Sequence, residues 1–486
     1  MNVGRAVRVW GLAVVLALVA FGSYRAALDR DTDVVSTEDI VYEQVPGTPL
    51  LSGRRAPLTL QAPVVDAEIA PVLQAMIDAS PEATCLQVQT GDRVLEPTSN
   101  TRTQLLPASN QKLFTTYAAL ELLGSDFTFT TEVRADGAVA GGVLDGNLYV
   151  IGDGDPYLTT ENWWEQYEET DGRFHTRLED LADDIAATGV VTVTGSLIGD
   201  ESLYDTVRAG PWAERILIQQ QSGPLSALAV NEGFNDWPSD TNGVARGRSP
   251  SSDPALDAVA VLNQLLAERG VQIEGGPATG VTPPGTTEVA AISSPNLVEI
   301  VTHVNSYSSN YGAELLLKRI GLFGAGEGST VAGSGVMLDL LRTDGVPTDG
   351  LLLEDGSGLA DTNRVTCAAI AAVLAAAGPD SDFARSLAIG AERGSLLLRF
   401  VESTAAGDVY AKTGTLNDST ALSGYVRSVT DPEQWLTFAY VANDELIIAN
   451  TEVRELQDPF VVAITDYPGE PVIEDLDPLE PIDADS

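Results

Sequence analysis

The sequence contains few of the residues from which metal sites and imidazole-based active sites are built. Its 486 residues include two cysteines, Cys85 and Cys367, and two histidines, His175 and His303. The cysteines lie 282 positions apart, and neither is near a second group of metal ligands, so a zinc site has little to build on. A Ser-His-Asp enzyme or a metal-dependent hydrolase is disfavoured because it would have to use one of two imidazoles. We expect core thiols at both cysteines, with a disulfide as the alternative in an oxidising compartment.

Basic residues are also scarce. The 27 Lys and Arg residues stand against 70 Asp and Glu residues, which gives a formal net charge of −43. This charge repels phosphate backbones and anionic headgroups, and so argues against nucleic acid as a partner. With 44% hydrophobic residues, 45 Gly and 26 Pro, the chain is neither disordered nor fibrous. Its length suggests about three modules, or one large domain with insertions.

The two ends of the chain differ from its middle. Arg5 and Arg8 precede an uncharged apolar run over 9–22, which predicts a signal peptide or an N-terminal anchor at residues 1–25. An acidic, irregular linker is predicted over 26–59. Residues 467–486 hold seven acidic residues, four prolines and no Lys or Arg, which predicts a disordered tail.

The hydrophobic pattern of the middle predicts a mixed α/β protein. Helices are predicted over 66–79, 105–123, 257–269, 295–304, 311–320 and 365–376, and strands over 84–89, 408–412, 423–429 and 435–441. The Gly- and Val-rich stretches 133–150 and 190–197 predict short strands and turns, so strands are expected to dominate between the first helices and residue 257.

Lysine is rare enough for each occurrence to be informative. Only Lys112, Lys318 and Lys412 are lysines among the 27 basic residues, and all others are arginines. A site that keeps lysine in such a chain needs an amine that can lose its proton, or a compact ammonium charge. Lys112 and Lys412 lie in motifs, whereas Lys318 does not, and we assign it no function.

The first motif is Ser109-Asn110-Gln111-Lys112. On a helix that starts here, residues i and i+3 share a face, so the Lys112 amine can reach the Ser109 hydroxyl and take its proton. The N–H groups of the helix N-terminus favour an oxyanion that develops beside Ser109. Taken alone, the motif is also compatible with a helix-capping serine and a solvated lysine.

The second motif is Lys412-Thr413-Gly414, on a predicted strand that leads into a turn. An ammonium and a hydroxyl there can bind a substrate carboxylate, and a glycine lets a substrate backbone lie against the strand edge. The triplet is rare by chance in a chain with three lysines, which disfavours a surface lysine without a function.

A third motif, Ser308-Ser309-Asn310, lies in a short polar break between two predicted helices. A hydroxyl and an amide projected from such a break can relay a proton and hold an amide carbonyl. Helix capping is the alternative for these residues.

With S-x-x-K, S-x-N and K-T-G in this order, the chain resembles the serine penicillin-recognising enzymes. Ser308 follows Ser109 by 199 positions, and Lys412 follows Ser308 by 104 positions. The long first gap is similar to that of the class C penicillin-binding proteins, the D-alanyl-D-alanine carboxypeptidases/endopeptidases of peptidase family S13. The stretches at 152–158, 292–297 and 354–366 resemble the same family, and the resemblance runs from about residue 63 to residue 466.

The resemblance implies an α/β (α+β) fold: a transpeptidase-like, β-lactamase-like domain that is split by a large β-rich insertion. The catalytic domain would comprise residues 60–133 and 288–466, with the insertion at 134–287 and the acidic tail at 467–486.

The resemblance also implies roles for the motif residues. Ser109 would be acylated and Lys112 would be its base, while Ser308 would pass the proton to the leaving amine. Asn310 would bind the peptide carbonyl. The substrate carboxylate would bind Lys412 and Thr413, next to Gly414, and the backbone N–H groups of Ser109 and Thr415 would form the oxyanion hole.

Two further residues are weaker candidates for substrate binding. In the family an acid of the insertion can face the free amine of the substrate's diamino acid, and Asp205 is the candidate here, with a plain surface aspartate as the alternative. Arg364 is a candidate for the same pocket, with pairing to a neighbouring acid as its alternative. Asp155 is expected to stabilise a turn, and Glu314 is expected on a helix surface.

These features together predict a serine DD-peptidase that acts on peptidoglycan stem peptides and cross-links and is acylated by β-lactams. It would need no cofactor and no metal, and would act outside the cytoplasm, in contact with a membrane only through an N-terminal anchor. The alternatives are a β-lactamase, and a non-catalytic peptidoglycan-binding or sensor module.

Overall fold

A computed structural model describes residues 58–167, 174–235, 249–445 and 451–468 of the chain. The predicted signal or anchor segment, nearly all of the linker and all but the first two residues of the acidic tail lie outside the described residues. Among the helices that are described, none combines the length and the apolar character that crossing a membrane requires.

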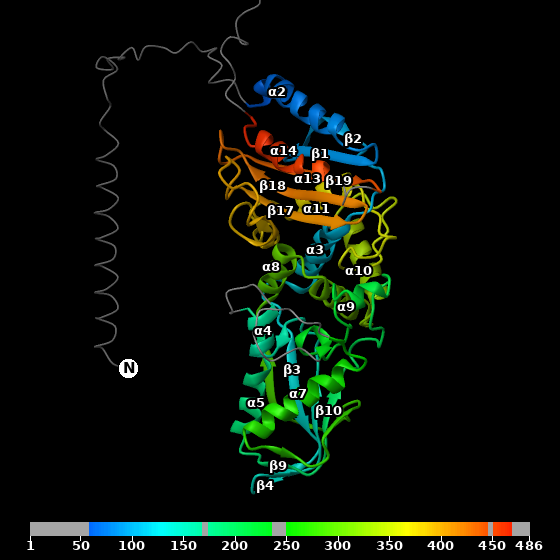
Figure 1. Ribbon diagram of the computed structural model, residues 1–486, viewed down its shortest axis with the longest axis vertical. Helices are drawn as coiled ribbons and strands as arrows, with labels where there is room; N and C mark the ends of the chain where they lie inside the picture. The colour runs from blue at the N-terminus through cyan, green and yellow to red at the C-terminus, as the bar shows by residue number, and fades with distance from the viewer. Residues whose placement is uncertain (1–57, 168–173, 236–248, 446–450, 469–486) are drawn as a thin grey trace, which may run out of the picture. The chain divides into compact units, whose positions relative to one another are not determined.

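The C-terminal half of the chain forms most of a six-stranded antiparallel sheet, in which the first two strands of the chain complete one edge (Figure 1). The strand order is β16-β17-β18-β19-β1-β2. The strands are β1 (Thr84–Thr90), β2 (Arg93–Ser99), β16 (Ala388–Ile389), β17 (Val409–Leu416), β18 (Ser419–Arg427) and β19 (Trp435–Asn443).

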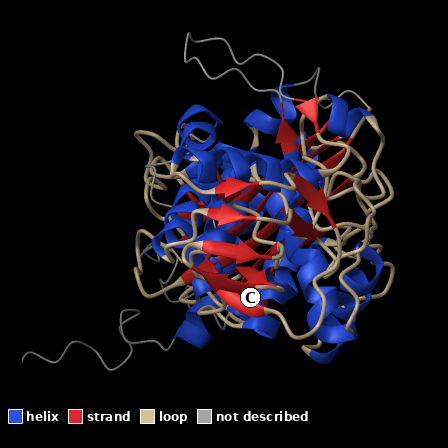
Figure 2. Ribbon diagram, turned by 90° about the horizontal axis from the view of Figure 1, so that it is seen from below, coloured by secondary structure: helices blue, strands red, loops and turns tan. Residues whose placement is uncertain are grey.

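Both faces of this sheet are covered by helices. Alternate residues point to opposite faces, so Leu422 and Phe438 pack with α2 and α14, whereas Ala421 and Ala439 pack with α3, α8, α9 and α11. Figure 2 shows helices on either side of the strands. The helices are α2 (Leu58–Ala79), α3 (Gln111–Leu123), α8 (Leu297–Tyr307), α9 (Asn310–Ala325), α10 (Thr330–Thr343), α11 (Cys367–Ala377), α12 (Asp382–Ser386), α13 (Thr451–Glu455) and α14 (Gln457–Ile464).

A disulfide joins Cys85 of β1 to Cys367, the first residue of α11. Both cysteines are fully buried. Of the two alternatives that the sequence left open, free core thiols are wrong, and the bond ties the sheet to the helical layer on one of its faces.

The segment between α3 and α8 builds a second, mixed sheet of five strands in the order β14-β10-β6-β3-β15. A smaller four-stranded sheet has the order β13-β9-β5-β4. Helices α5 and α7 pack with the strands of this region in a separate hydrophobic core. The five-stranded sheet consists of β3 (Thr130–Ala135), β6 (Leu148–Ile151), β10 (Leu197–Asp200), β14 (Pro277–Thr279) and β15 (Thr287–Ser293).

The remaining elements of this segment are short apart from two helices. The strands are β4 (Ala138–Ala140), β5 (Val143–Asp145), β7 (Leu158–Thr159), β8 (Thr176–Arg177), β9 (Thr192–Val193), β11 (Phe234–Asn235), β12 (Ser249–Pro250) and β13 (Gln272–Ile273). The helices are α4 (Glu161–Tyr167), α5 (Leu178–Ala187), α6 (Arg215–Ile218) and α7 (Pro254–Glu268).

Pairing between β3 and β15 determines where this segment leaves and rejoins the rest of the chain. Thr130 of β3 is opposite Ser293 of β15, so the chain re-enters next to the point where it left. The predicted insertion, 134–287, begins inside β3 and ends at the first residue of β15. The sheet of the inserted segment therefore extends a few residues beyond the predicted boundaries at both ends.

The predicted helices and strands outside the insertion correspond to observed elements, but two helices begin elsewhere: α2 starts at Leu58, eight positions before the predicted start at 66, and α3 starts later than predicted. The helix predicted over 105–123 begins only at Gln111, because Leu105 pairs with Val365 in an isolated bridge and residues 108–110 form a 3₁₀ turn. The sequence did not predict helices α4, α5, α6, α10, α12, α13 and α14, whereas α7 was predicted at 257–269. Because α4, α5 and α6 all lie before residue 257, strands alone do not dominate that stretch.

Candidate active site

Ser109 lies in the 3₁₀ turn Ala108–Asn110 that leads directly into α3. Ala108 has a left-handed backbone, with φ of +49°. Two glycines lie directly against this turn. A Cβ added at Gly414 would lie 2.9 Å from the Pro107 carbonyl oxygen, and one added at Gly358 would lie 1.9 Å from the Ala108 carbonyl oxygen. Strand β17 and the loop that contains Gly358 therefore fix the turn that carries Ser109.

The two residues between Ser109 and Lys112 anchor the start of α3 with buried side chains. Asn110 donates from Nδ2 to Oγ of Ser423 at 2.8 Å, and Gln111 donates from Nε2 to the carbonyl oxygen of Asp355 at 2.9 Å. These bonds attach the S-x-x-K segment to β18 and to the loop at 355–360.

Lys112 is fully buried and donates three hydrogen bonds. Its Nζ lies 3.0 Å from Oγ of Ser109, 2.7 Å from Oδ1 of Asn310 and 2.6 Å from the carbonyl oxygen of Ser357. Burial lowers the pKa of Lys112 to about 7, although the nearby carboxyls of Asp355 and Glu314 oppose this shift. A lysine with this pKa is neutral often enough near pH 7 to accept the proton of a serine hydroxyl.

The S-x-N motif forms the junction between α8 and α9. Ser308 is half-buried at the C-cap of α8 with a left-handed backbone, φ of +64°, and Asn310 is the first residue of α9. The Asn310 amide is held at both of its ends. Its Oδ1 accepts from Lys112, and its Nδ2 donates to the carbonyl oxygen of Gln221 at 2.7 Å. Gln221 belongs to the inserted segment, so the insertion contacts the site directly.

The K-T-G motif lies within β17. Lys412 is fully buried and donates to the carbonyl oxygen of Thr413 at 3.0 Å. Burial lowers the pKa of Lys412 well below its usual value, and the nearby charge of Lys112 adds to the effect. Thr413 donates from its hydroxyl to Oγ of Ser395 at 2.9 Å, and Thr415 is exposed.

The edge of β17 beyond Ala411 has no strand partner on one side within the described residues. Strand β16 pairs with Tyr410 and Ala411 only, whereas β18 pairs with β17 along its whole length. Backbone N–H and C=O groups at such an edge can pair with an extended peptide. Gly414 faces the Ser109 turn, which gives this glycine a packing reason in addition to the substrate contact that the sequence suggested.

One group near Lys112 is not in the place that the sequence predicted. Glu314 was expected on a helix surface, and this is wrong: its side chain is fully buried. It lies four residues after Asn310 in α9, a helix with buried residues on all sides over 311–318. The one sign of this burial in the sequence is that the residues around Glu314, at 311–317, carry no other charge and include three consecutive leucines.

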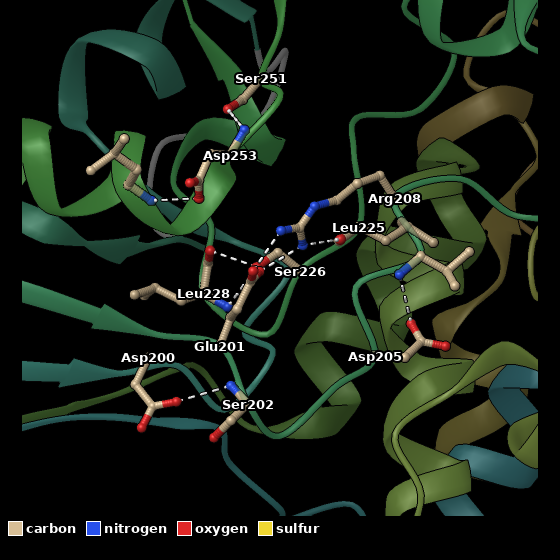
Figure 3. Close-up of polar contacts among 12 residues, drawn as sticks. Asp200, Glu201, Ser202, Asp205, Arg208, Leu225, Ser226, Leu228, Ser251 and Asp253 are labelled. Atoms are coloured by element: carbon tan, nitrogen blue, oxygen red, sulfur yellow. Dashed lines mark hydrogen bonds and ion pairs between the residues drawn. The ribbon is translucent and has the colours of Figure 1, made fainter. Parts of the chain in front are cut away.

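Asp205 and Arg364 are placed with other partners. Asp205 forms an ion pair with the fully buried amine of Lys318, and accepts from the backbone N–H of Val207 at 3.2 Å. Figure 3 shows Asp205 apart from the neighbouring pair of Glu201 and Arg208, which are joined at 2.6 Å. Arg364 donates to the carbonyl oxygens of two residues of its own loop, at 2.8 and 2.7 Å. These bonds do not test whether either side chain binds substrate, and both assignments stay predictions.

Comparison with known proteins identifies similar chains. The model of the D-Ala-D-Ala carboxypeptidase 3 (S13) family matches residues 78–250 and 237–467. A D-alanyl-D-alanine carboxypeptidase from an Actinomadura species is 31% identical over 441 residues, covering 75% of this chain and 78% of the relative. A carboxypeptidase from Mycolicibacterium smegmatis is 29% identical over 357 residues, covering 71% and 72%.

A solved structure shares the fold. Penicillin-binding protein 4 from Haemophilus influenzae superposes with a TM-score of 0.68 at 20% identity, covering 81% of this chain and 98% of the other. The same protein has been solved in complex with a β-lactam, with a TM-score of 0.63 to this chain at 19% identity and the same coverage.

Proposed function

Because the chain belongs to the D-Ala-D-Ala carboxypeptidase (S13) family, and is thus a serine DD-peptidase that acts on peptidoglycan, we propose that it works through an acyl-enzyme on Ser109. The observation that carries the proposal is the 3.0 Å contact between Oγ of Ser109 and the buried Nζ of Lys112. A nucleophile and a base within hydrogen-bonding distance, with the base oriented by further partners, is the arrangement that covalent catalysis requires.

In the first half of the reaction, neutral Lys112 takes the proton of Ser109 as Oγ attacks the carbonyl carbon of the penultimate D-alanine. The C–N bond then breaks, the serine ester forms, and the amine of the terminal D-alanine leaves with a proton passed on through Ser308. Water hydrolyses the ester in the second half and restores Ser109. Asn310 supports this assignment because its Oδ1 orients Lys112, while the second N–H of its Nδ2, beside the one that donates to Gln221, would bind a peptide carbonyl.

The substrate would lie along the unpaired edge of β17. We assign the oxyanion hole to the backbone N–H groups of Ser109 and Thr415, and the terminal carboxylate to Lys412 and Thr413. The exposure of Thr415 and the free strand edge support this placement. A β-lactam with its carboxylate and acyl amide would use the same contacts and acylate Ser109.

Asp205 and Arg364 belong to the proposal as candidates for binding the far part of the substrate. A free substrate amine would have to compete with Lys318 for the Asp205 carboxylate. We also propose that residues 60–133 and 288–466 form the catalytic domain, and that 134–287 form the domain that borders it.

Action on peptidoglycan places the site outside the cytoplasm. The Cys85–Cys367 disulfide agrees with folding in an oxidising compartment. We propose that residues 1–25 export the chain, either as a cleaved signal or as a retained membrane anchor.

Intact-protein mass spectrometry of the full chain after exposure to benzylpenicillin tests this function, with Ser109→Ala as the control. A long-lived adduct on the wild type alone, together with release of D-alanine from an acyl-D-Ala-D-Ala peptide, is the expected result. Rapid hydrolysis of the drug without an adduct would identify a β-lactamase instead. A wild type that neither forms an adduct nor hydrolyses the drug would overturn the proposed site.

A further inference from the structure

Glu314 has an unusual environment for a carboxyl group close to an active site. Its Oε1 accepts hydrogen bonds from the backbone N–H groups of Gly356 and Ser357, at 3.1 and 2.8 Å. Its Oε2 is buried and has no hydrogen-bond partner among the described residues. An ionised carboxylate with a bare, buried oxygen is costly, whereas a protonated carboxyl places its O–H on that oxygen at a lower cost.

Asp355, the carboxyl next to it, has the opposite environment. Both of its oxygens accept hydrogen bonds: Oδ1 from the Gly358 N–H and from Nδ2 of Asn363, each at 2.8 Å, and Oδ2 from the Ala360 N–H at 2.7 Å. Three donors stabilise the ionised form. Burial raises the pKa of both carboxyls, and the charge of Asp355 helps to raise that of Glu314 to about 8.

The same loop connects these two carboxyls to Lys112. The Ser357 N–H donates to Glu314, and the Ser357 carbonyl accepts from Nζ of Lys112 at 2.6 Å. Gly358, whose N–H donates to Asp355, packs on Ala108 next to Ser109. The loop is therefore held by Asp355 and Glu314 and in turn holds the amine of Lys112.

We propose that Glu314 is a proton-bearing positioning residue of this active site: it fixes Ser357 against Lys112 while protonated, and its ionisation adds a second negative charge beside the ionised Asp355, which favours the ammonium form of Lys112 and so opposes the loss of its proton. The inference rests on the proposed role of Lys112 as the base. Among the described residues, the titratable groups that face Lys112 are Asp355 from the loop, Glu314 from α9 and Lys412 from β17.

The expected effect on the enzyme is a coupled titration. As pH rises, Lys112 begins to lose its proton while Glu314 is still protonated. When Glu314 then ionises, its charge favours the ammonium form of Lys112, so the rest of that titration moves to higher pH. Activity of the wild type should consequently rise over a wider pH range than the titration of one isolated group.

The experiment measures the second-order rate constant for acylation by a chromogenic cephalosporin, from about pH 5 to about pH 10, for the full chain and three variants. Glu314→Gln keeps an acceptor for Gly356 and Ser357 but cannot ionise. Glu314→Ala removes the acceptor as well. Asp155→Asn is the matched control, because Asp155 is also a buried carboxyl with a raised pKa, and accepts from Tyr157 N–H and Thr176 in the inserted segment.

At neutral pH, Glu314→Gln should be acylated with a rate constant within about threefold of the wild-type value. Its pH–rate profile should rise more steeply, with a midpoint displaced by about one pH unit to lower pH. The acylation rate constant of Glu314→Ala should be about tenfold or more below that of the wild type at every pH, because the Ser357 N–H no longer has its acceptor. Asp155→Asn should keep the wild-type midpoint and slope.

Two results would overturn the inference alone: a Glu314→Gln profile with the midpoint and slope of the wild type, or one as impaired as Glu314→Ala at all pH values. The pH range over which the wild-type acylation rate rises is a readout that needs no variant. A rise as steep as the titration of one isolated group would contradict the coupling between Glu314 and Lys112. If the wild type were not acylated at Ser109 at any pH, the proposed function would fail, and this inference with it.

Discussion

Nζ of Lys112 and Oδ1 of Asn310 are hydrogen-bonded at 2.7 Å across 198 positions of sequence. The bond joins the first turn of α3 to the first residue of α9, two helices that pack in the same hydrophobic core. The same amine lies 3.0 Å from Oγ of Ser109, while the Asn310 amide nitrogen donates to the carbonyl oxygen of Gln221. The S-x-x-K and S-x-N motifs therefore form one unit, whose function depends on the charge state of Lys112.

Lys112→Arg should remove the catalytic base while it keeps the positive charge at this position. A guanidinium does not lose its proton in a protein, so the base is lost, and acylation by benzylpenicillin should fall by about 10²- to 10⁴-fold. Rates of adduct formation by mass spectrometry measure the effect. Lys318→Arg is the matched control at a second fully buried lysine, and it should react like the wild type because benzylpenicillin has no diamino acid to reach Asp205. Equal loss in both variants would contradict the role of Lys112.

The pH dependence of acylation follows from the lowered pKa of Lys112. The ammonium form cannot accept a proton, so the rate should be low in acid, rise with pH, and reach half of its plateau near pH 7. An unperturbed lysine would place this rise above about pH 10. Stopped-flow acylation at constant ionic strength measures the profile. A rate that is independent of pH through this range would show that Lys112 does not titrate as the base.

Much of this site could be predicted from the sequence, since the three motifs are local and each carries its own chemistry. The Lys112 amine reaches the Ser109 hydroxyl as the helical spacing predicted, and it also contacts Asn310, which the sequence did not predict. The surroundings of Lys112 could not be predicted in this way. Glu314 and Lys318 look like surface residues of a helix, because the sequence does not show that the sheet domain and the inserted segment together bury α9 on all sides.

Long-range pairing also explains the error at the start of α3. The apolar spacing from residue 105 onward is helical, yet Leu105 pairs with Val365 and the next residues are fixed by contacts with Gly358 and Gly414. Tertiary contacts override a local helical preference when they bury more surface or satisfy more backbone groups. Such partners lie hundreds of positions away, and no local pattern identifies them.

Gly358→Ala should damage the nucleophile without changing any reactive group. Gly358 has φ of +88°, and a Cβ there would lie 1.9 Å from the Ala108 carbonyl oxygen, so the turn that carries Ser109 must move. We expect acylation to fall by about tenfold or more and the free energy of unfolding by about 1–3 kcal/mol. Urea unfolding and acylation rates measure the two effects.

Gly335→Ala provides the control for that substitution. Gly335 is exposed within α10, and nothing lies within 4 Å of an added Cβ. Alanine there should leave acylation unchanged and stabilise the helix by up to about 1 kcal/mol. Equal effects of the two substitutions would show that close packing at Gly358 is not what positions Ser109.

Removal of the disulfide should lower stability much more than activity. The bond closes a loop of 282 positions, and a Cys85→Ala, Cys367→Ala double variant should lose about 3–5 kcal/mol of unfolding free energy. Urea unfolding of the double variant and of the wild type measures the difference. Benzylpenicillin should still acylate the variant in the absence of urea. A difference below about 1 kcal/mol would indicate that the bond adds little to the stability of the fold.

Variants at Asp205 and Lys318 can distinguish a structural role of Asp205 from a role in substrate binding. Lys318 is fully buried and Asp205 is partly exposed, so Asp205→Ala leaves a buried ammonium without its acid and should cost about 2 kcal/mol of unfolding free energy. Lys318→Met removes the buried charge, and the double variant should recover most of that loss. If the aspartate only supports the fold, the double variant should also regain peptidase activity on a substrate with a diamino acid. If Asp205 binds the substrate amine, peptidase activity on that substrate should stay low in the double variant. The single variant Lys318→Met, which frees the Asp205 carboxylate, should then retain its activity on the same substrate.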